Sequence, residues 1–192
     1  MNLALTVIAI LAVLVAVAFF TLRRMGSRGT PDALRPGHPL PAFAARTENG
    51  DTVQSESLRG RPAVLLFVRG NWCPFCSKQV ADLTKYYKEI ADGGAKLVLV
   101  TPKPLETTRR VAEFFDVEFE FWLDEDLAAA SRVGLALRGG VPKEHRADYG
   151  DDTLWPAAVV IDRDGQIRYT SVSKFIADRP NPRKLMQVLN SL

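Results

Sequence analysis

Residues 63–76 read Ala-Val-Leu-Leu-Phe-Val-Arg-Gly-Asn-Trp-Cys-Pro-Phe-Cys, and this stretch decides the fold. Its first six residues form a continuous apolar run, which is typical of a strand covered on both faces of a sheet. Pro74 suits the first position of a helix, because the N–H that proline lacks has no helical partner there in any case. We therefore predict a buried strand, a short turn and a helix that begins beside the cysteine pair.

Cys73 and Cys76 are the only cysteines of the chain, and they flank the predicted start of this helix. Unpaired N–H groups and the helix dipole favour a negative charge at a helix N-terminus, so we expect a lowered pKa for Cys73 and a reactive thiolate. A helix end that follows a loop should also leave this outer sulfur accessible. Cys76 falls one turn later on the apolar face, from where it can close a disulfide with Cys73.

Three other interpretations compete with a redox-active pair. A structural disulfide across so short a loop would remove little chain entropy. A zinc site needs about four ligands, whereas the two histidines, His38 and His145, are isolated in the sequence. Two inert buried thiols are the third alternative, which the position at a helix N-terminus disfavours. We therefore expect redox chemistry that uses no metal and no other cofactor.

Strands and helices alternate on either side of the cysteine pair. Asn49-Gly50 predicts a hairpin between extended runs at 43–46 and 52–54, because both residues tolerate positive φ. The other predicted elements are a helix from 74 to the Gly93-Gly94 pair, strands over 96–100 and 119–123, helices over 105–115 and 127–133, a hairpin of strands 157–161 and 167–172, and a helix over 182–192. This order predicts an α/β fold with a mixed central sheet flanked by helices.

The N-terminus carries a separate apolar segment. Residues 3–22 contain no charge, and about 20 helical residues span roughly 30 Å, the thickness of a bilayer core. We predict a transmembrane anchor over residues 1–24, a linker over 25–36 and one domain over 37–192. A cleaved signal peptide is the alternative, although no positive charge precedes the apolar run.

Charge bears on both orientation and partners. Arg23, Arg24 and Arg28 follow the predicted anchor and no basic residue precedes it, so the positive-inside rule places the domain on the cytoplasmic side. The alternative is that the domain faces the periplasm, as it does in many tethered thioredoxin-like proteins of bacteria. The rest of the chain holds 22 basic and 22 acidic residues, without the basic face that a nucleic-acid partner requires.

Five stretches of the domain resemble the peroxiredoxin-like branch of the alkyl hydroperoxide reductase/thiol-specific antioxidant group, within the thioredoxin superfamily. They are Gly37–Phe43, Leu58–Pro62, Phe67–Cys76, Trp155–Gly165 and Asn181–Leu189. The resemblance implies a thioredoxin-like fold and reduction of hydrogen or alkyl peroxides at a thiol.

The resemblance also implies roles for individual residues. Cys73 would attack the peroxide and become a sulfenate, Cys76 would resolve it as a disulfide, and thioredoxin or a similar dithiol would reduce the disulfide. Arg69, just upstream, is the expected cation beside the thiolate, with a solvated arginine as the alternative. Trp72 could provide an apolar wall beside the outer sulfur or simply be a core tryptophan.

Pro156 directly precedes the predicted strand at 157–161, where a proline is awkward unless it marks the first residue. In thioredoxin-like folds, which this arrangement resembles, such a proline is cis and packs against the cysteine pair. The preceding residue, Trp155, would then offer backbone groups to an extended substrate. An ordinary trans proline at the start of a strand is the alternative.

The sequence also departs from the family. Typical peroxiredoxins have a threonine or serine three residues before the reactive cysteine and a proline seven before it, where this chain has Gly70 and Leu66. A second cysteine three residues on is instead the thioredoxin arrangement, which favours thiol–disulfide exchange with protein disulfides. A non-catalytic membrane module is a third hypothesis. The irregular stretch 135–152 could close over the cysteine pair or remain a solvated loop.

Overall fold

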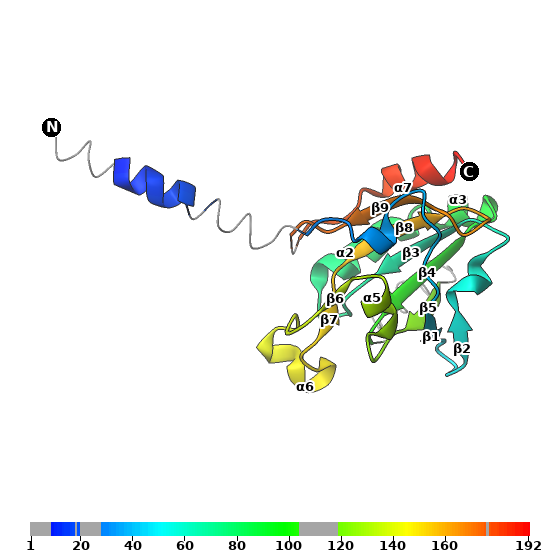
Figure 1. Ribbon diagram of the computed structural model, residues 1–192, viewed down its shortest axis with the longest axis horizontal. Coiled ribbons are helices and arrows are strands. Elements are labelled where there is room, and N and C mark those ends of the chain that lie inside the picture. Colours follow the sequence, from blue (N-terminus) through cyan, green and yellow to red (C-terminus); the bar gives the residue numbers. More distant parts are fainter. Residues whose placement is uncertain (1–8, 18, 20–27, 104–118, 176) are drawn as a thin grey trace.

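A seven-stranded mixed sheet forms the centre of the computed structural model, which describes residues 9–17, 19, 28–103, 119–175 and 177–192 (Figure 1). The strand order is β2-β1-β5-β4-β3-β8-β9. The strands are β1 (Ala44–Arg46), β2 (Thr52–Gln54), β3 (Ala63–Phe67), β4 (Lys96–Thr101), β5 (Glu120–Leu123), β8 (Ala157–Ile161) and β9 (Ile167–Val172). β3 pairs in parallel with β4 and antiparallel with β8, so the predicted mixed sheet is confirmed.

Helices cover both faces of this sheet. α2 (Pro74–Thr84), α3 (Tyr87–Asp92) and α7 (Pro182–Leu189) pack on one face, and α5 (Ala128–Arg132) packs on the other (Figure 1). The short elements are the 3-10 helices η1 (Asp32–Leu34), η2 (Ser55–Leu58) and η3 (Lys143–His145), the helix α6 (Arg146–Tyr149), and a separate two-stranded sheet of β6 (Ala136–Leu137) and β7 (Thr153–Leu154). The layered arrangement is the predicted thioredoxin-like α/β fold.

The central strand β3 explains why the core divides in two. All five of its residues are fully buried, and alternate side chains point to opposite faces of the sheet. Leu65 and Phe67 join the core beneath α5, whereas Val64 and Leu66 join the core beneath α2 and α7. The second of these cores also contains both cysteines.

The sequence predicted one helix from Pro74 to the glycine pair, and this prediction is wrong in one respect. The chain forms two helices, because Tyr86 has φ −107° and ψ 1° and its N–H donates to the Leu83 carbonyl over 2.9 Å. The predicted apolar stripe still faces the core on both helices, since Leu83 and Ile90 are buried. The predicted helix at 105–115 lies outside the described residues.

The N-terminal predictions fall partly on described residues. Residues 9–17 and 19 are helical, and the rest of the predicted anchor lies outside the described residues. Within the part of the chain that is described, no helix has the length and apolar character needed to cross a bilayer. Residues 28–36, assigned to the linker, lie against the domain: Leu34 is fully buried, and its carbonyl accepts a hydrogen bond from the Thr170 hydroxyl over 2.6 Å.

Candidate active site

The cysteine pair lies where β3 leads into α2. Val68 continues the pairing beyond the end of β3, because its N–H donates to a carbonyl of β4 over 2.9 Å. The chain then turns, and the Cys73 N–H donates to the Gly70 carbonyl over 3.2 Å. Pro74 begins the helix, and the Cys76 N–H donates to the Cys73 carbonyl over 2.9 Å. The predicted strand, turn and helix therefore place Cys73 at the N-cap and Cys76 in the first turn.

Both cysteines are buried thiols that no disulfide joins. Cys73 is 1% exposed and Cys76 is 0% exposed. The expectation that the outer sulfur would be accessible is therefore wrong. The reason is tertiary, because the segment between β9 and α7 brings an arginine, Arg179, against the two sulfurs.

Arg179 is the cation in direct contact with the cysteine pair. Its Nη2 donates to the Cys73 sulfur over 3.3 Å and to the Cys76 sulfur over 3.2 Å. Its guanidinium also lies 5.9 Å from the ring centroid of Phe75, which is partly exposed on the first turn of α2. One guanidinium nitrogen thus donates a hydrogen bond to each of the two sulfurs.

The two thiols titrate in opposite directions. The pKa of Cys73 is lowered from 9.0 to about 5, chiefly because the Cys76 side chain donates a hydrogen bond to it; burial opposes this, and the charges of Arg69 and Arg179 assist. The pKa of Cys76 is raised well above its ordinary value, because its proton is held in that hydrogen bond, it is buried, and it faces the Cys73 thiolate. Cys73 is therefore the thiol of the pair that is ionised at neutral pH, and Cys76 keeps its proton.

Arg69, the cation expected from the sequence, is buried beside the pair and forms part of a layered stack. Its guanidinium lies 5.0 Å from the ring centroid of Trp72. His145 stacks on Trp72 at 5.8 Å with an interplanar angle of 29°, and Tyr149 meets His145 edge-on at 6.4 Å. His145 and Tyr149 come from η3 and α6, so part of the stretch predicted to be irregular folds over Trp72.

Several buried polar side-chain atoms in the turn that precedes Cys73 have no hydrogen-bond partner among the described residues. They include the donors Arg69 Nε and Trp72 Nε1 and the acceptor Asn71 Oδ1. An unpartnered buried donor or acceptor is costly in free energy and so calls for an explanation. Gly70 lies among them with φ +124°, and a Cβ there would come within 3.2 Å of Trp72 Cδ1.

Trp155 and Pro156 lie at the start of β8, close to the same site. The Trp155–Pro156 peptide bond is trans, so the cis proline implied by the resemblance is not found. Pro156 directly precedes the first residue of β8, where its missing N–H costs the sheet no hydrogen bond. The Trp155 N–H donates to the Leu135 carbonyl over 2.6 Å, so that group is already engaged. The Trp155 indole N–H donates to the Ser173 carbonyl.

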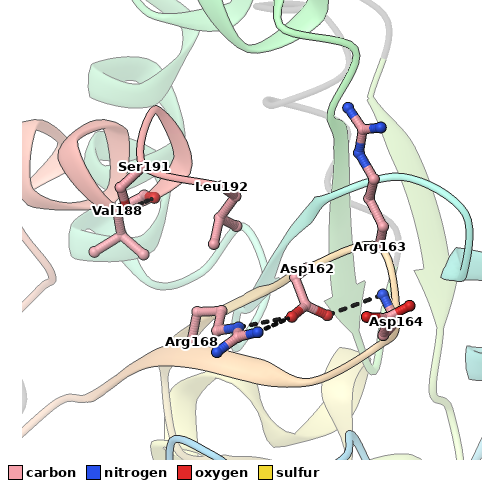
Figure 2. A pocket seen from close by; sticks show the side chains of 7 residues that line it. All are labelled: Asp162, Arg163, Asp164, Arg168, Val188, Ser191 and Leu192. Carbon is pink, nitrogen blue, oxygen red and sulfur yellow. Dashed lines mark hydrogen bonds and ion pairs between the residues drawn. The ribbon is translucent and has the colours of Figure 1, made fainter.

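A pocket of about 630 Å³ lies at the opposite end of β8 (Figure 2). It is bounded by the β8–β9 turn and the end of α7. The Asp162 carboxylate accepts hydrogen bonds there from the Asp164 N–H over 2.9 Å and from Arg168 Nε over 2.6 Å. The Ser191 hydroxyl donates to the Val188 carbonyl over 2.6 Å. These contacts stabilise a turn and a helix end, and no cysteine lines the pocket.

Comparison with known families gives one match over most of the chain. The model of the AhpC/TSA family matches residues 36–170. This range contains the hairpin, the sheet except for the last two residues of β9, the cysteine pair and the loop over Trp72.

The similar proteins include both peroxiredoxins and a thiol-disulfide oxidoreductase. Peroxiredoxin Q of Oryza sativa subsp. japonica is 22% identical over 158 residues, covering 81% of this chain and 67% of the rice protein. The thiol-disulfide oxidoreductase ResA of Halalkalibacterium halodurans is 24% identical over 102 residues, covering 53% of this chain and 57% of ResA. Among solved structures, peroxidoxin BcpB of Mycobacterium tuberculosis superposes with a TM-score of 0.65 at 19% identity, over 83% of this chain and 98% of BcpB.

Proposed function

The chain belongs to the AhpC/TSA family, and we propose that it is a thiol peroxidase that reduces hydrogen or alkyl peroxides at Cys73. The observation that carries the proposal is the state of the Cys73 sulfur. A pKa of about 5 leaves it as a thiolate at neutral pH, and the thiolate is the form that attacks a peroxide. Its burial favours a small substrate over a bulky one, since Cys73 is only 1% exposed.

In the first step, the Cys73 thiolate attacks the terminal oxygen of the peroxide. The S–O bond forms as the O–O bond breaks, the sulfur gives up two electrons and becomes a sulfenic acid, and the leaving alkoxide or hydroxide takes a proton to become an alcohol or water. Arg179 can stabilise the charge on the sulfur before the attack, because its Nη2 lies 3.3 Å from that atom.

In the second step, the Cys76 sulfur attacks the sulfur of the sulfenic acid. The S–S bond forms, the S–O bond breaks, and the hydroxyl leaves as water with the proton from Cys76. Negative charge would develop on Cys76 in this step, and the Nη2 of Arg179 lies 3.2 Å from it. We propose that a thioredoxin-like dithiol then reduces the disulfide by exchange, which returns both cysteines to thiols.

The unpartnered side-chain atoms of the turn before Cys73 support a peroxide as the substrate. A hydroperoxide offers oxygen acceptors and one O–H donor, and the residues before Cys73 hold two unpartnered donors, on Arg69 and Trp72, and one acceptor, on Asn71. We propose that the Trp72 N–H takes the place of the hydroxyl that typical peroxiredoxins carry three residues before the cysteine, where this chain has Gly70.

The peroxidase proposal is tested by adding hydrogen peroxide or cumene hydroperoxide to the reduced full chain. We expect consumption of one peroxide per Cys73, loss of the reaction in C73S, and a trapped sulfenate in C76S that dimedone labels. Survival of both thiols in excess peroxide would refute the proposal. Trp72→Phe keeps the ring of the stack but removes one hydrogen bond, so kcat/KM should fall roughly 2- to 12-fold, with the alkylation of Cys73 unchanged.

A thiol–disulfide oxidoreductase acting on protein disulfides is the second candidate. The spacing of Cys73 and Cys76 favours it, as does the similarity to a protein named for that activity. One observation weighs against it: the backbone N–H of Trp155, which would pair with an extended protein substrate, already donates to the Leu135 carbonyl. It predicts insulin reduction by the reduced chain and covalent adducts through Cys73 in C76S. Absence of both, with peroxide turnover retained, would exclude it.

We further propose that residues 1–24 tether the enzyme to a membrane, with the domain on the cytoplasmic side. The support is the charge-free stretch at 3–22 and the basic residues that follow it, Arg23, Arg24 and Arg28. The chain should remain in the membrane fraction after a carbonate wash, and deletion of residues 1–24 should release it. Digestion of the domain by protease added to intact spheroplasts would place it on the periplasmic side instead.

A further inference from the structure

We propose that Ser173 is the positioning residue that holds Arg179 against both cysteine sulfurs, and that Trp155 braces Ser173 from the other side. This inference deepens the proposed function, because it concerns the charge beside the reactive thiol. It gives Trp155 a structural role beside the site, one that does not require the contact with a substrate that the resemblance implied.

Ser173 lies one residue beyond β9 and is 1% exposed. Its hydroxyl donates to the Asp178 carbonyl over 2.6 Å and accepts from Arg179 Nη1 over 3.3 Å. Arg179 Nη1 also donates to the Asp178 carbonyl over 2.6 Å. The hydroxyl, the carbonyl and the guanidinium therefore hold one another in place at the start of the segment that leads to α7.

The contacts of one guanidinium nitrogen fix the position of the other. The guanidinium is planar and rigid, so its N–H groups point in directions that are set relative to one another. With Nη1 tied to Ser173 and to the Asp178 carbonyl, Nη2 is directed at the sulfurs of Cys73 and Cys76, 3.3 and 3.2 Å away. Without the hydroxyl, Arg179 would have more freedom to turn toward solvent, because its side chain is only half-buried.

Ser173 is itself tied to the sheet, which makes it suited to this role. Its N–H donates to the Pro156 carbonyl over 2.9 Å, which extends the antiparallel pairing of β8 and β9 by one step. Its carbonyl accepts the indole N–H of Trp155. Arg179 is thus linked to the rigid sheet through Ser173. A site supported by sheet residues keeps its geometry better than one supported by a loop alone.

The test measures the reactivity of the Cys73 thiol directly, without peroxide. The reduced full chain is alkylated with iodoacetamide at a series of pH values, and labelling of the Cys73 peptide is followed by mass spectrometry. In S173A the midpoint of the pH profile should rise by about half to one pH unit, which would lower the thiolate fraction at pH 5, and with it the alkylation rate, roughly two- to fivefold. S173T keeps the hydroxyl and should restore the wild-type profile.

Two further variants separate positioning from general destabilisation. T170V on β9 removes a hydroxyl hydrogen bond of 2.6 Å to the Leu34 carbonyl, and it should leave the profile unchanged. W155F keeps the aromatic ring without its N–H and should shift the profile in the same direction as S173A. An S173A profile identical to wild type, or an equal shift in T170V, would overturn the inference. A chain that shows the S173A shift but consumes no peroxide would disprove the proposed function and leave the inference standing.

Discussion

Replacement of Cys76 by alanine should raise the pKa of Cys73. The largest cause that lowers this pKa to about 5 is the hydrogen bond from the Cys76 side chain. An S–H donor stabilises the thiolate much more than the neutral thiol, so its loss disfavours ionisation. The charges of Arg69 and Arg179 stay in place in the variant, so the pKa should remain below that of free cysteine.

The size of the effect follows from the strength of one hydrogen bond. A hydrogen bond to a charged group contributes about 1.5–3 kcal/mol, and one pH unit corresponds to about 1.4 kcal/mol, so the pKa of Cys73 should rise by about one to two pH units. The thiolate fraction at pH 5 would then fall from roughly one half to between one in ten and one in a hundred. Alkylation of Cys73 should slow roughly 5- to 50-fold at pH 5 and change little at pH 8.

The assay is iodoacetamide labelling of the reduced full chain between about pH 4 and pH 9, with quantification of the Cys73 peptide by mass spectrometry. C76S is the matched control, because serine keeps an O–H donor at the same place and should move the midpoint less than alanine does. A midpoint in C76A equal to that of the wild type would refute the reasoning. Equal shifts in C76A and C76S would show that the hydrogen bond is not the cause.

Three other predictions follow from the described contacts. Peroxide consumption should be level from about pH 6 to pH 8 and fall about tenfold per pH unit below pH 5, because the Cys73 thiolate is lost as the pH falls through its pKa; a decline that begins near pH 8 in stopped-flow assays would contradict this. Gly70→Thr should lower both the melting temperature and turnover, since a Cβ there lies 3.2 Å from Trp72 and φ is +124°; a gain in turnover would show that the hydroxyl was needed after all. Asp124→Ala should cost about 1–3 kcal/mol in urea unfolding, because the buried carboxylate accepts two N–H groups of α5 over 2.8 Å; an unchanged midpoint would argue against that helix cap.

Much of the frame around the site could be predicted from the sequence because the signals are local. The apolar run of β3, the proline at the start of α2 and the Asn49-Gly50 turn each act over a few residues, and each is found where it was expected. The break at Tyr86 was not predictable in this way. The apolar stripe continues across it, so the periodicity alone could not distinguish one helix from two.

The cation at the thiols could not be predicted, and the reason is physical. Arg179 contacts a cysteine 106 residues earlier, and the contact depends on how β9 leads into α7. The sequence around Arg179 has no helical or strand periodicity that would indicate which way its side chain points. Arg69 was the natural choice because it lies four residues before Cys73. The structure places it against the Trp72 ring, where its charge still helps to lower the pKa of Cys73.

The placement of a single guanidinium between two sulfurs bears on the order of the chemistry. When Cys73 is the thiolate, Cys76 keeps its proton, because a second negative charge beside the first is disfavoured and the pKa of Cys76 is raised. If peroxide oxidises the Cys73 sulfur as proposed, its negative charge would be gone, and both that repulsion and the hydrogen bond that held the proton of Cys76 would be lost with it. Arg179 is then in position to favour the thiolate of Cys76 over 3.2 Å. In the proposed reaction, Cys76 would therefore become nucleophilic only after the first step, because the hydrogen bond that lowers the pKa of Cys73 also keeps Cys76 protonated until then.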